Sequence, residues 1–196
     1  ICAINNEFLR GLVLWSHGSA WLPESVSLAS QRATAVKSFG LNQTMANNEN
    51  HNAEMDVRKL AIILNNYHFD FILFDACFMA SIEVFYELRN TTDYIIASPT
   101  EVLATGFPYK DILTDMLSAT VNYQKIAQKY VAFFQQKKGV LQSASVVTVK
   151  TAELPQFATL FKYYLNTISR EITDQKWLQY SQDEVDYLFD LGQVAR

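Results

Sequence analysis

The sequence predicts an α/β domain with a mainly parallel β-sheet and helices on both faces. Short apolar runs alternate along the chain with longer segments whose apolar residues recur at helical spacing, and this alternation is typical of parallel sheets with crossover helices. Two of the runs, residues 11–16 and 69–74, are almost continuously apolar, as expected for strands buried on both faces. A length of 196 residues with 49% hydrophobic content suits one domain with a substantial core.

Strands are expected where apolar or β-branched residues cluster. The two apolar runs are followed by a third short one at residues 94–97, and the β-branched segment 145–149 predicts a fourth strand. Between the first two strands, residues 21–52 are rich in Ser, Asn, Gln and Ala and show no sustained apolar period. We expect this segment to form a long loop, which in a compact domain is usually functional or disordered.

Helices are expected where apolar residues recur every three or four positions. This spacing predicts helices over residues 55–65, 81–88, 109–119, 122–138, from about 155 to 168, and 182–196. Gly139 follows the fourth of these segments and is expected to end it as a C-cap.

Charge and composition exclude several classes of function. The net charge of −4 gives no support to nucleic-acid binding, and no apolar run reaches the roughly 18 to 20 residues that a membrane span needs. With two cysteines, Cys2 and Cys77, a disulfide scaffold is not expected, and Cys2 is interpreted as incidental. His51 has no second ligand at a suitable spacing, and no D-x-D-x-D-G loop occurs, so we predict neither a metal nor a cofactor.

Both apolar strands end in a reactive side chain, His17 after the first and Cys77 after the second. In a parallel sheet, functional groups gather beyond the carboxyl ends of the strands, so these two residues are expected to meet although 60 positions separate them. An imidazole beside a thiol favours the thiolate, the attacking species of a cysteine nucleophile. Gly18 lets the backbone approach a substrate closely, and its N–H is a candidate donor of an oxyanion hole. A structural histidine and an inert core cysteine are the alternatives.

Asp75 lies two residues before Cys77 and next to the apolar strand. An unpaired carboxylate is costly to bury there, so the residue needs an explanation. Two interpretations stay open: a functional carboxylate beside the nucleophile, or the N-cap of the helix that follows.

Five ordered motifs carry a family resemblance. Residues 14–21, 74–81, 86–89, 94–99 and 106–109 resemble the clostripain-like cysteine peptidases, which belong to the group with a caspase-like sheet. The resemblance extends from about residue 11 to residue 117. It implies endopeptidase activity after Arg or Lys, with His17 as the catalytic histidine and Cys77 as the nucleophile.

The resemblance also assigns the substrate site. Asp75 corresponds to the acidic residue that binds the basic P1 side chain, a role that suits a carboxylate on the nucleophile's own turn. The loop 98–109 corresponds to a wall of the S1 pocket, with Thr100 and Glu101 as substrate-binding residues. The alternatives are a catalytically silent caspase-like binding domain, or a dyad enzyme with a different P1 preference or transpeptidase activity.

The resemblance also implies a secreted or cell-envelope enzyme made as a zymogen that is cut between the His and Cys motifs. In this chain, Arg32 and Lys37 are the only Arg or Lys residues of the segment 21–52. Arg32 is the favoured cleavage site because Lys37 directly precedes residues 38–40, which are expected to pack as the loop returns to the fold. The relatives have additional strands before the His-bearing strand and continue beyond residue 196, so we expect a single peptidase domain that is incomplete at both ends. Without its neighbouring strand, the run 12–16 is expected to form an exposed hydrophobic edge.

Overall fold

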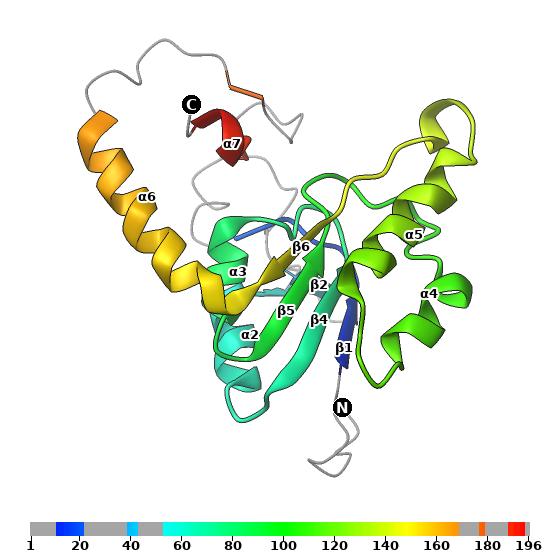
Figure 1. Cartoon of the computed structure of the whole chain (residues 1–196), viewed down its shortest axis with the longest axis horizontal. Helices are drawn as coiled ribbons and strands as arrows, with labels where there is room; N and C mark the ends of the chain where they lie inside the picture. The colour runs from blue at the N-terminus through cyan, green and yellow to red at the C-terminus, as the bar shows by residue number, and fades with distance from the viewer. Residues whose placement is uncertain (1–10, 22–38, 43–52, 169–176, 179–187, 195–196) are drawn as a thin grey trace, which may run out of the picture. The chain divides into compact units, whose positions relative to one another are not determined.

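The computed structural model describes residues 11–21, 39–42, 53–168, 177–178 and 188–194. They belong to two compact units that divide after Thr151, and each unit is described by itself. The first unit contains a four-stranded sheet in the order β1-β4-β5-β6 (Figure 1). Its strands are β1 (Gly11–Trp15), β4 (Phe69–Asp75), β5 (Thr92–Ala97) and β6 (Val147–Lys150).

The sheet is mainly parallel, as predicted. The strands β1, β4 and β5 run parallel to one another, whereas β6 pairs antiparallel with β5. The fourth strand begins at Val147 rather than at residue 145, because its first partner is Ala97, the last residue of β5.

The two apolar runs differ in burial. All residues of β4 except the half-buried Asp70 are buried, as predicted. The strand β1 is not buried on both faces as its apolar run predicts, because Val13 is 37% and Trp15 75% exposed. This exposure agrees with the hydrophobic edge that the resemblance predicts for residues 12–16. Among the described residues, the strand β1 lies at the edge of the sheet and is paired with another strand on one side only.

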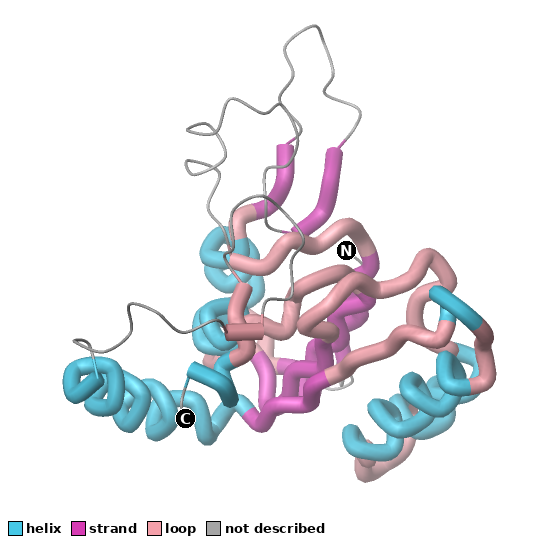
Figure 2. The backbone as a smooth tube through the Cα atoms, turned by 90° about the horizontal axis from the view of Figure 1, so that it is seen from above, coloured by secondary structure: helices cyan, strands magenta, loops and turns pink. Residues whose placement is uncertain are grey.

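Helices cover both faces of the sheet (Figure 2). One side carries α2 (Val57–Leu64) and α3 (Ile82–Leu88), and the other carries α4 (Tyr109–Met116) and α5 (Tyr123–Gln135). The core on the α4–α5 side is a cluster of buried residues from the strands and both helices, namely Phe71, Leu73, Ile96, Phe107, Ile112, Met116, Ile126, Tyr130 and Phe134. The predicted arrangement of a sheet between two helical layers is therefore confirmed.

Capping side chains explain several helix ends. The helix predicted from residue 55 begins at Val57, because Asp56 caps it by accepting a hydrogen bond from the Arg58 N–H at 2.7 Å. The C-cap prediction for Gly139 is wrong. The cap of α5 is Gln136, and Gly139, with a φ of +61°, begins a short 3-10 helix, η2 (Gly139–Leu141).

The long loop expected over residues 21–52 contains a strand. Two short strands, β2 (Phe39–Asn42) and β3 (Ala53–Met55), pair antiparallel. Met55 belongs to β3, which is why it is not part of the following helix. Strands of three or four residues are too short to show a period of two, so neither strand could be predicted from its apolar pattern. The remaining residues of the segment, 22–38 and 43–52, lie outside the described part of the chain.

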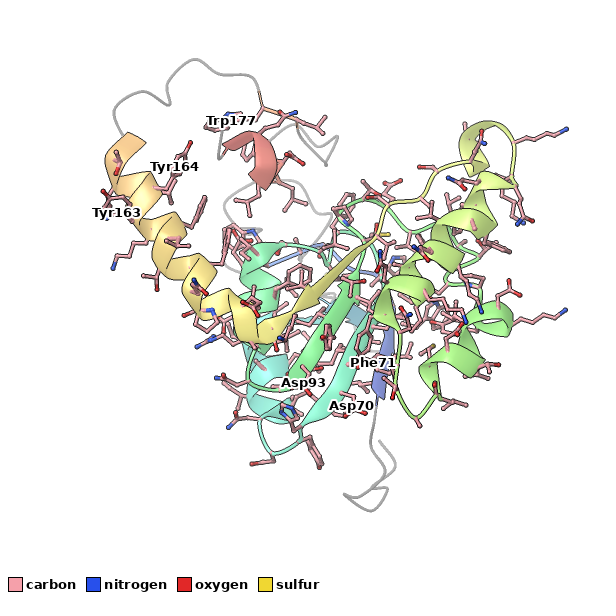
Figure 3. The ribbon with its side chains drawn as sticks, in the orientation of Figure 1. Asp70, Phe71, Asp93, Tyr163, Tyr164 and Trp177 are labelled. Atoms are coloured by element: carbon pink, nitrogen blue, oxygen red, sulfur yellow. The ribbon has the colours of Figure 1, made fainter. Side chains whose placement is uncertain are left out.

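The second unit contains two described helices, α6 (Leu154–Ile168) after the short 3-10 helix η3 (Thr151–Glu153), and α7 (Leu191–Val194). Tyr163 and Tyr164 lie toward the carboxyl end of α6 (Figure 3). The helix predicted over residues 182–196 is confirmed only at α7, because residues 188–190 are not helical and residues 179–187 lie outside the described part. No helix among the described residues is long and apolar enough to cross a membrane.

Candidate active site

The register of β1 and β4 brings His17 and Cys77 to the same end of the sheet, beyond the carboxyl ends of the two strands. Trp15 pairs with Asp75 at the carboxyl ends of these two adjacent parallel strands. His17 and Cys77 each follow this pair by two residues. The His17 side chain is exposed and the Cys77 side chain is half-buried. His17 and Cys77 therefore both lie beyond the carboxyl ends of β1 and β4, as expected from the two apolar runs.

The segment after His17 lies directly against the turn that carries Cys77. A Cβ atom on Gly18 would be 2.5 Å from the Cys77 carbonyl oxygen and 3.0 Å from side-chain atoms of Ala76 and Met79. Met79 is fully buried, so it has little room to move. Only glycine permits this approach, and it brings the Gly18 backbone next to Cys77.

Two residues near the reactive groups have strained backbone conformations. Ala20 has a φ of 69° and Phe78 a φ of 60°, values that non-glycine residues rarely adopt. Phe78 follows Cys77 directly, and Ala20 lies three residues after His17. Each such conformation costs on the order of 1–3 kcal/mol, and conformations of this kind concentrate at functional sites.

The Cys77 sulfur contacts a backbone group of the following loop. The Val102 N–H donates to Cys77 Sγ at 3.3 Å, and the Val102 carbonyl oxygen lies 3.7 Å from the same sulfur. The thiol is free. A backbone N–H aimed at sulfur suits the anionic form that attacks a substrate.

The same loop follows the Cys77 turn for several residues. Phe78 N–H donates to the Thr100 carbonyl oxygen at 3.1 Å, and Ala80 N–H donates to the Ser98 carbonyl oxygen at 3.0 Å. These bonds hold Thr100 and Glu101 beside Cys77, with Thr100 half-buried and Glu101 exposed. Both candidate substrate-binding residues therefore lie next to Cys77, and their roles remain predictions.

Asp75 is buried, with 3% of its surface exposed. Its Oδ2 accepts hydrogen bonds from the Tyr109 hydroxyl at 2.7 Å and from the Phe107 N–H at 3.2 Å. Its Oδ1 is also buried and has no hydrogen-bond partner among the described residues. No Lys, Arg or His in the described ranges forms an ion pair with this carboxylate.

The N-cap interpretation of Asp75 is wrong. The helix α3 begins at Ile82, and its cap is Ser81, whose Oγ accepts a hydrogen bond from the Val84 N–H at 3.3 Å. Asp75 instead binds the end of the loop 98–109. Gly106, with a φ of +62°, packs against it so closely that a Cβ atom would be 2.5 Å from Oδ2.

Two tyrosines near this carboxylate have a raised pKa. Burial, the hydrogen bond to Asp75 and the charge of Asp75 together raise the pKa of Tyr109 far above its usual value. Burial raises the pKa of Tyr130 to about 12, with smaller contributions from the charges of Asp75 and Cys77. Both hydroxyls are therefore protonated at any physiological pH.

Other features of the first unit lie apart from this site. A hollow of about 630 Å³ is lined by Tyr94, Thr120, Val121, Asn122, Tyr123, Gln124, Ala127 and Thr148, and includes neither Cys77 nor Asp75. Asp70 and Asp93 lie near the amino ends of β4 and β5, away from the edge that carries Cys77 (Figure 3). Within the described ranges, no three His, Cys, Asp or Glu side chains are grouped to hold a metal ion.

Comparison with known proteins identifies the family. The sequence profile of the clostripain family, peptidase family C11, matches residues 3–192. The chain therefore belongs to the clostripain family of cysteine peptidases. Among curated proteins, none matches the chain significantly.

Solved structures of C11 proteases have the same fold. A secreted C11 cysteine protease from Bacteroides thetaiotaomicron, "iotapain", superposes with a TM-score of 0.74 at 26% identity, over 93% of this chain and 50% of that one. An inactive C11 zymogen from Parabacteroides distasonis gives 0.70 at 32% identity, over 92% and 47%. A clostripain from Bacteroides thetaiotaomicron, in complex with the peptide inhibitor BTN-VLTK-AOMK, gives 0.62 at 27% identity, over 71% and 62%.

These similarities confirm the predicted caspase-like fold. The chain spans about half the length of the first two of these proteins. Neither Tyr109 nor the Val102 N–H is assigned a role by the sequence motifs. The motif 106–109 could have pointed to Tyr109, because its glycine and proline indicate a tight turn directly before this residue. A backbone donor such as Val102 leaves no mark in a sequence.

Proposed function

We propose that this domain is a cysteine endopeptidase that cleaves peptide bonds after Lys or Arg. His17 takes the thiol proton as Cys77 Sγ attacks the scissile carbonyl carbon, and then gives this proton to the leaving amine. Water hydrolyses the resulting thioester, which releases the acid product and restores the thiol. The Gly18 N–H stabilises the oxyanion of both steps. The observation that carries the proposal is the β1–β4 register, which delivers His17 and Cys77 to the same sheet edge.

Asp75 is the proposed binding group for the basic P1 side chain. A buried polar atom without a partner costs about 1–3 kcal/mol, and more if it is charged. Asp75 Oδ1 is such an atom, and a substrate cation would relieve this cost. Thr100 and Glu101 contribute to the rim of the same site. The clostripain solved with BTN-VLTK-AOMK supports a basic P1 residue, because its peptide reads VLTK.

Covalent labelling tests the proposal. A lysyl or arginyl peptide chloromethylketone is expected to add once to the chain, with the adduct mapped to Cys77 by mass spectrometry, and Cys77→Ala is expected to remain unlabelled. The matched reagent with norleucine at P1 is expected to react more slowly. An adduct on Cys2, or no adduct, would favour a catalytically silent binding domain. Equal rates for basic and neutral reagents would indicate a different P1 preference, and peptide ligation in place of hydrolysis would indicate a transpeptidase.

Secretion and self-processing complete the proposed function. The similar structures include a secreted C11 protease and an inactive C11 zymogen, which supports a secreted enzyme made as a zymogen. The proposed cleavage sites, Arg32 and Lys37, lie between the His and Cys motifs, outside the described part of the chain. A basic residue there matches the specificity that we propose for the enzyme itself.

We expect the wild-type chain to split on storage after Arg32 or Lys37, because both are basic residues in a long polar segment that starts close to His17. The measurement is intact mass against time, with Cys77→Ala as the inactive control. Arg32→Gln and Lys37→Gln, made singly and together, locate the cleaved bond. Activation by cleavage is wrong if wild type stays whole while fully active. Cleavage that persists in Cys77→Ala would indicate another protease.

A further inference from the structure

We propose that Asp75 offers a single carboxylate oxygen to the substrate, because Tyr109 and the Phe107 N–H occupy the other, and that the P1 preference is therefore lysine over arginine. This inference rests on the proposed function and adds the identity of the P1 residue. It makes Tyr109 a positioning residue that acts through Asp75.

The two oxygens of Asp75 have different surroundings. A carboxylate oxygen has two lone pairs, and those of Oδ2 are taken by the Tyr109 hydroxyl at 2.7 Å and the Phe107 N–H at 3.2 Å. The Gly106 backbone also covers this oxygen, since a Cβ atom there would be 2.5 Å from it. Oδ1 is bound by none of the described residues. Of the two oxygens, Oδ1 is therefore the one with acceptor positions left for a new donor, and this donor must reach it below the surface because the atom is buried.

Arginine and lysine differ in what they require from a carboxylate. The planar guanidinium gains most when two parallel N–H groups bind both oxygens at once. The ammonium group is a compact charge that can use a single acceptor. With Oδ2 saturated, an arginine loses the second bond of its bidentate pair, whereas a lysine loses nothing. The occupied oxygen thus discriminates against arginine.

The Tyr109 hydroxyl is a durable donor. Tyr109 is the first residue of α4 and packs against the core cluster of that helix. Its raised pKa keeps the hydroxyl protonated, so the bond to Oδ2 does not change with pH over the range in which the enzyme would work. Phe107 is buried and stacks on Tyr130, with ring centroids 4.1 Å apart, which fixes the second donor.

The chain offers a matched control for Tyr109. Tyr130 is buried, and the charge of Asp75 contributes to its raised pKa. Its hydroxyl forms none of the hydrogen bonds to this carboxylate. Tyr130→Phe therefore removes a hydroxyl from the same neighbourhood without freeing Oδ2. Tyr109→Phe removes the bonded hydroxyl and frees one acceptor position on that oxygen.

The experiment measures kcat and KM for three peptides that differ only at P1, with Lys, Arg or norleucine. Wild type is expected to give a higher kcat/KM for Lys than for Arg. Tyr109→Phe is expected to raise the Arg-to-Lys ratio of kcat/KM about tenfold, the scale of one hydrogen bond to a charged group, mainly through KM. Tyr130→Phe is expected to leave this ratio unchanged. Thermal denaturation shows that each variant is folded.

Failure of the inference is distinguishable from failure of the proposed function. If wild type cleaves the Arg peptide as well as or better than the Lys peptide, and both better than the norleucine peptide, the inference is overturned and the function stands. An equal loss for both basic peptides in Tyr109→Phe also overturns it, because a merely structural role lowers both together. If neither basic peptide is preferred to norleucine, the P1 assignment itself is wrong. The wild-type ratio alone decides if Tyr109→Phe does not fold.

Discussion

Replacing Cys77 by alanine is expected to lower kcat for peptides with a basic P1 residue by about 10⁴-fold or more. Removing the nucleophile of a hydrolase leaves only what binding and oxyanion stabilisation contribute, a loss that can reach the order of 10⁶-fold. The matched control is Cys2→Ala, which removes the other thiol of the chain and is expected to leave activity unchanged. Activity is measured by initial rates at saturating substrate, after thermal denaturation has shown that both variants are folded.

Variants of His17 test whether this residue and Cys77 act together. If His17 and Cys77 act as one unit, His17→Ala lowers kcat by a similar factor, and the double variant is no worse than the worse single variant. The register of β1 and β4 is the structural reason to expect this coupling. Losses that multiply in the double variant would show that the two residues act independently, and the dyad would then be wrong.

The sheet, and the position of His17 and Cys77 beyond its strands, could be predicted from the sequence because both depend on strong local patterns. The buried strand β4 appears as an apolar run, and a parallel sheet then determines where the residue after each strand lies. The exposure of Trp15 could not be predicted from the apolar pattern; the family resemblance alone indicated an exposed edge there. Its burial depends on what lies beside β1, and the apolar pattern of a strand does not say whether a neighbour is present.

The surroundings of Asp75 show a second limit. The sequence placed a carboxylate beside Cys77 but left its partners open, because Tyr109 is 34 positions away. The Phe107 and Val102 donors are backbone groups, which every residue but proline carries. Such contacts depend on how a loop returns to the sheet, and spacing alone does not determine that path. The strained φ of Phe78 is likewise visible only in the folded chain.

Asp75→Asn is expected to lower kcat/KM for basic P1 peptides by about 30- to 150-fold, which corresponds to about 2–3 kcal/mol, the scale of a hydrogen bond between charged groups. The change is conservative for the fold. The amide oxygen can occupy the place of Oδ2 and accept from the Tyr109 hydroxyl and the Phe107 N–H, because both groups are donors. The NH₂ group must then take the place of Oδ1. A donor thus faces the P1 cation where wild type presents an acceptor.

Asp75→Asn is therefore expected to affect basic and neutral peptides differently, which a general disruption of the fold would not do. Cleavage of the matched norleucine peptide is expected to stay within about threefold of wild type, while both basic peptides lose most of their advantage, since the loss of the charge-assisted pair concerns only a cationic P1 side chain. Asp75→Glu is a useful second variant: it keeps the charge but adds a methylene group where Gly106 leaves no room. If Asp75→Asn cleaves basic peptides as well as wild type does, Asp75 is not the P1 site. Its buried carboxylate would then serve to anchor the end of the loop 98–109 through Tyr109 and the Phe107 N–H.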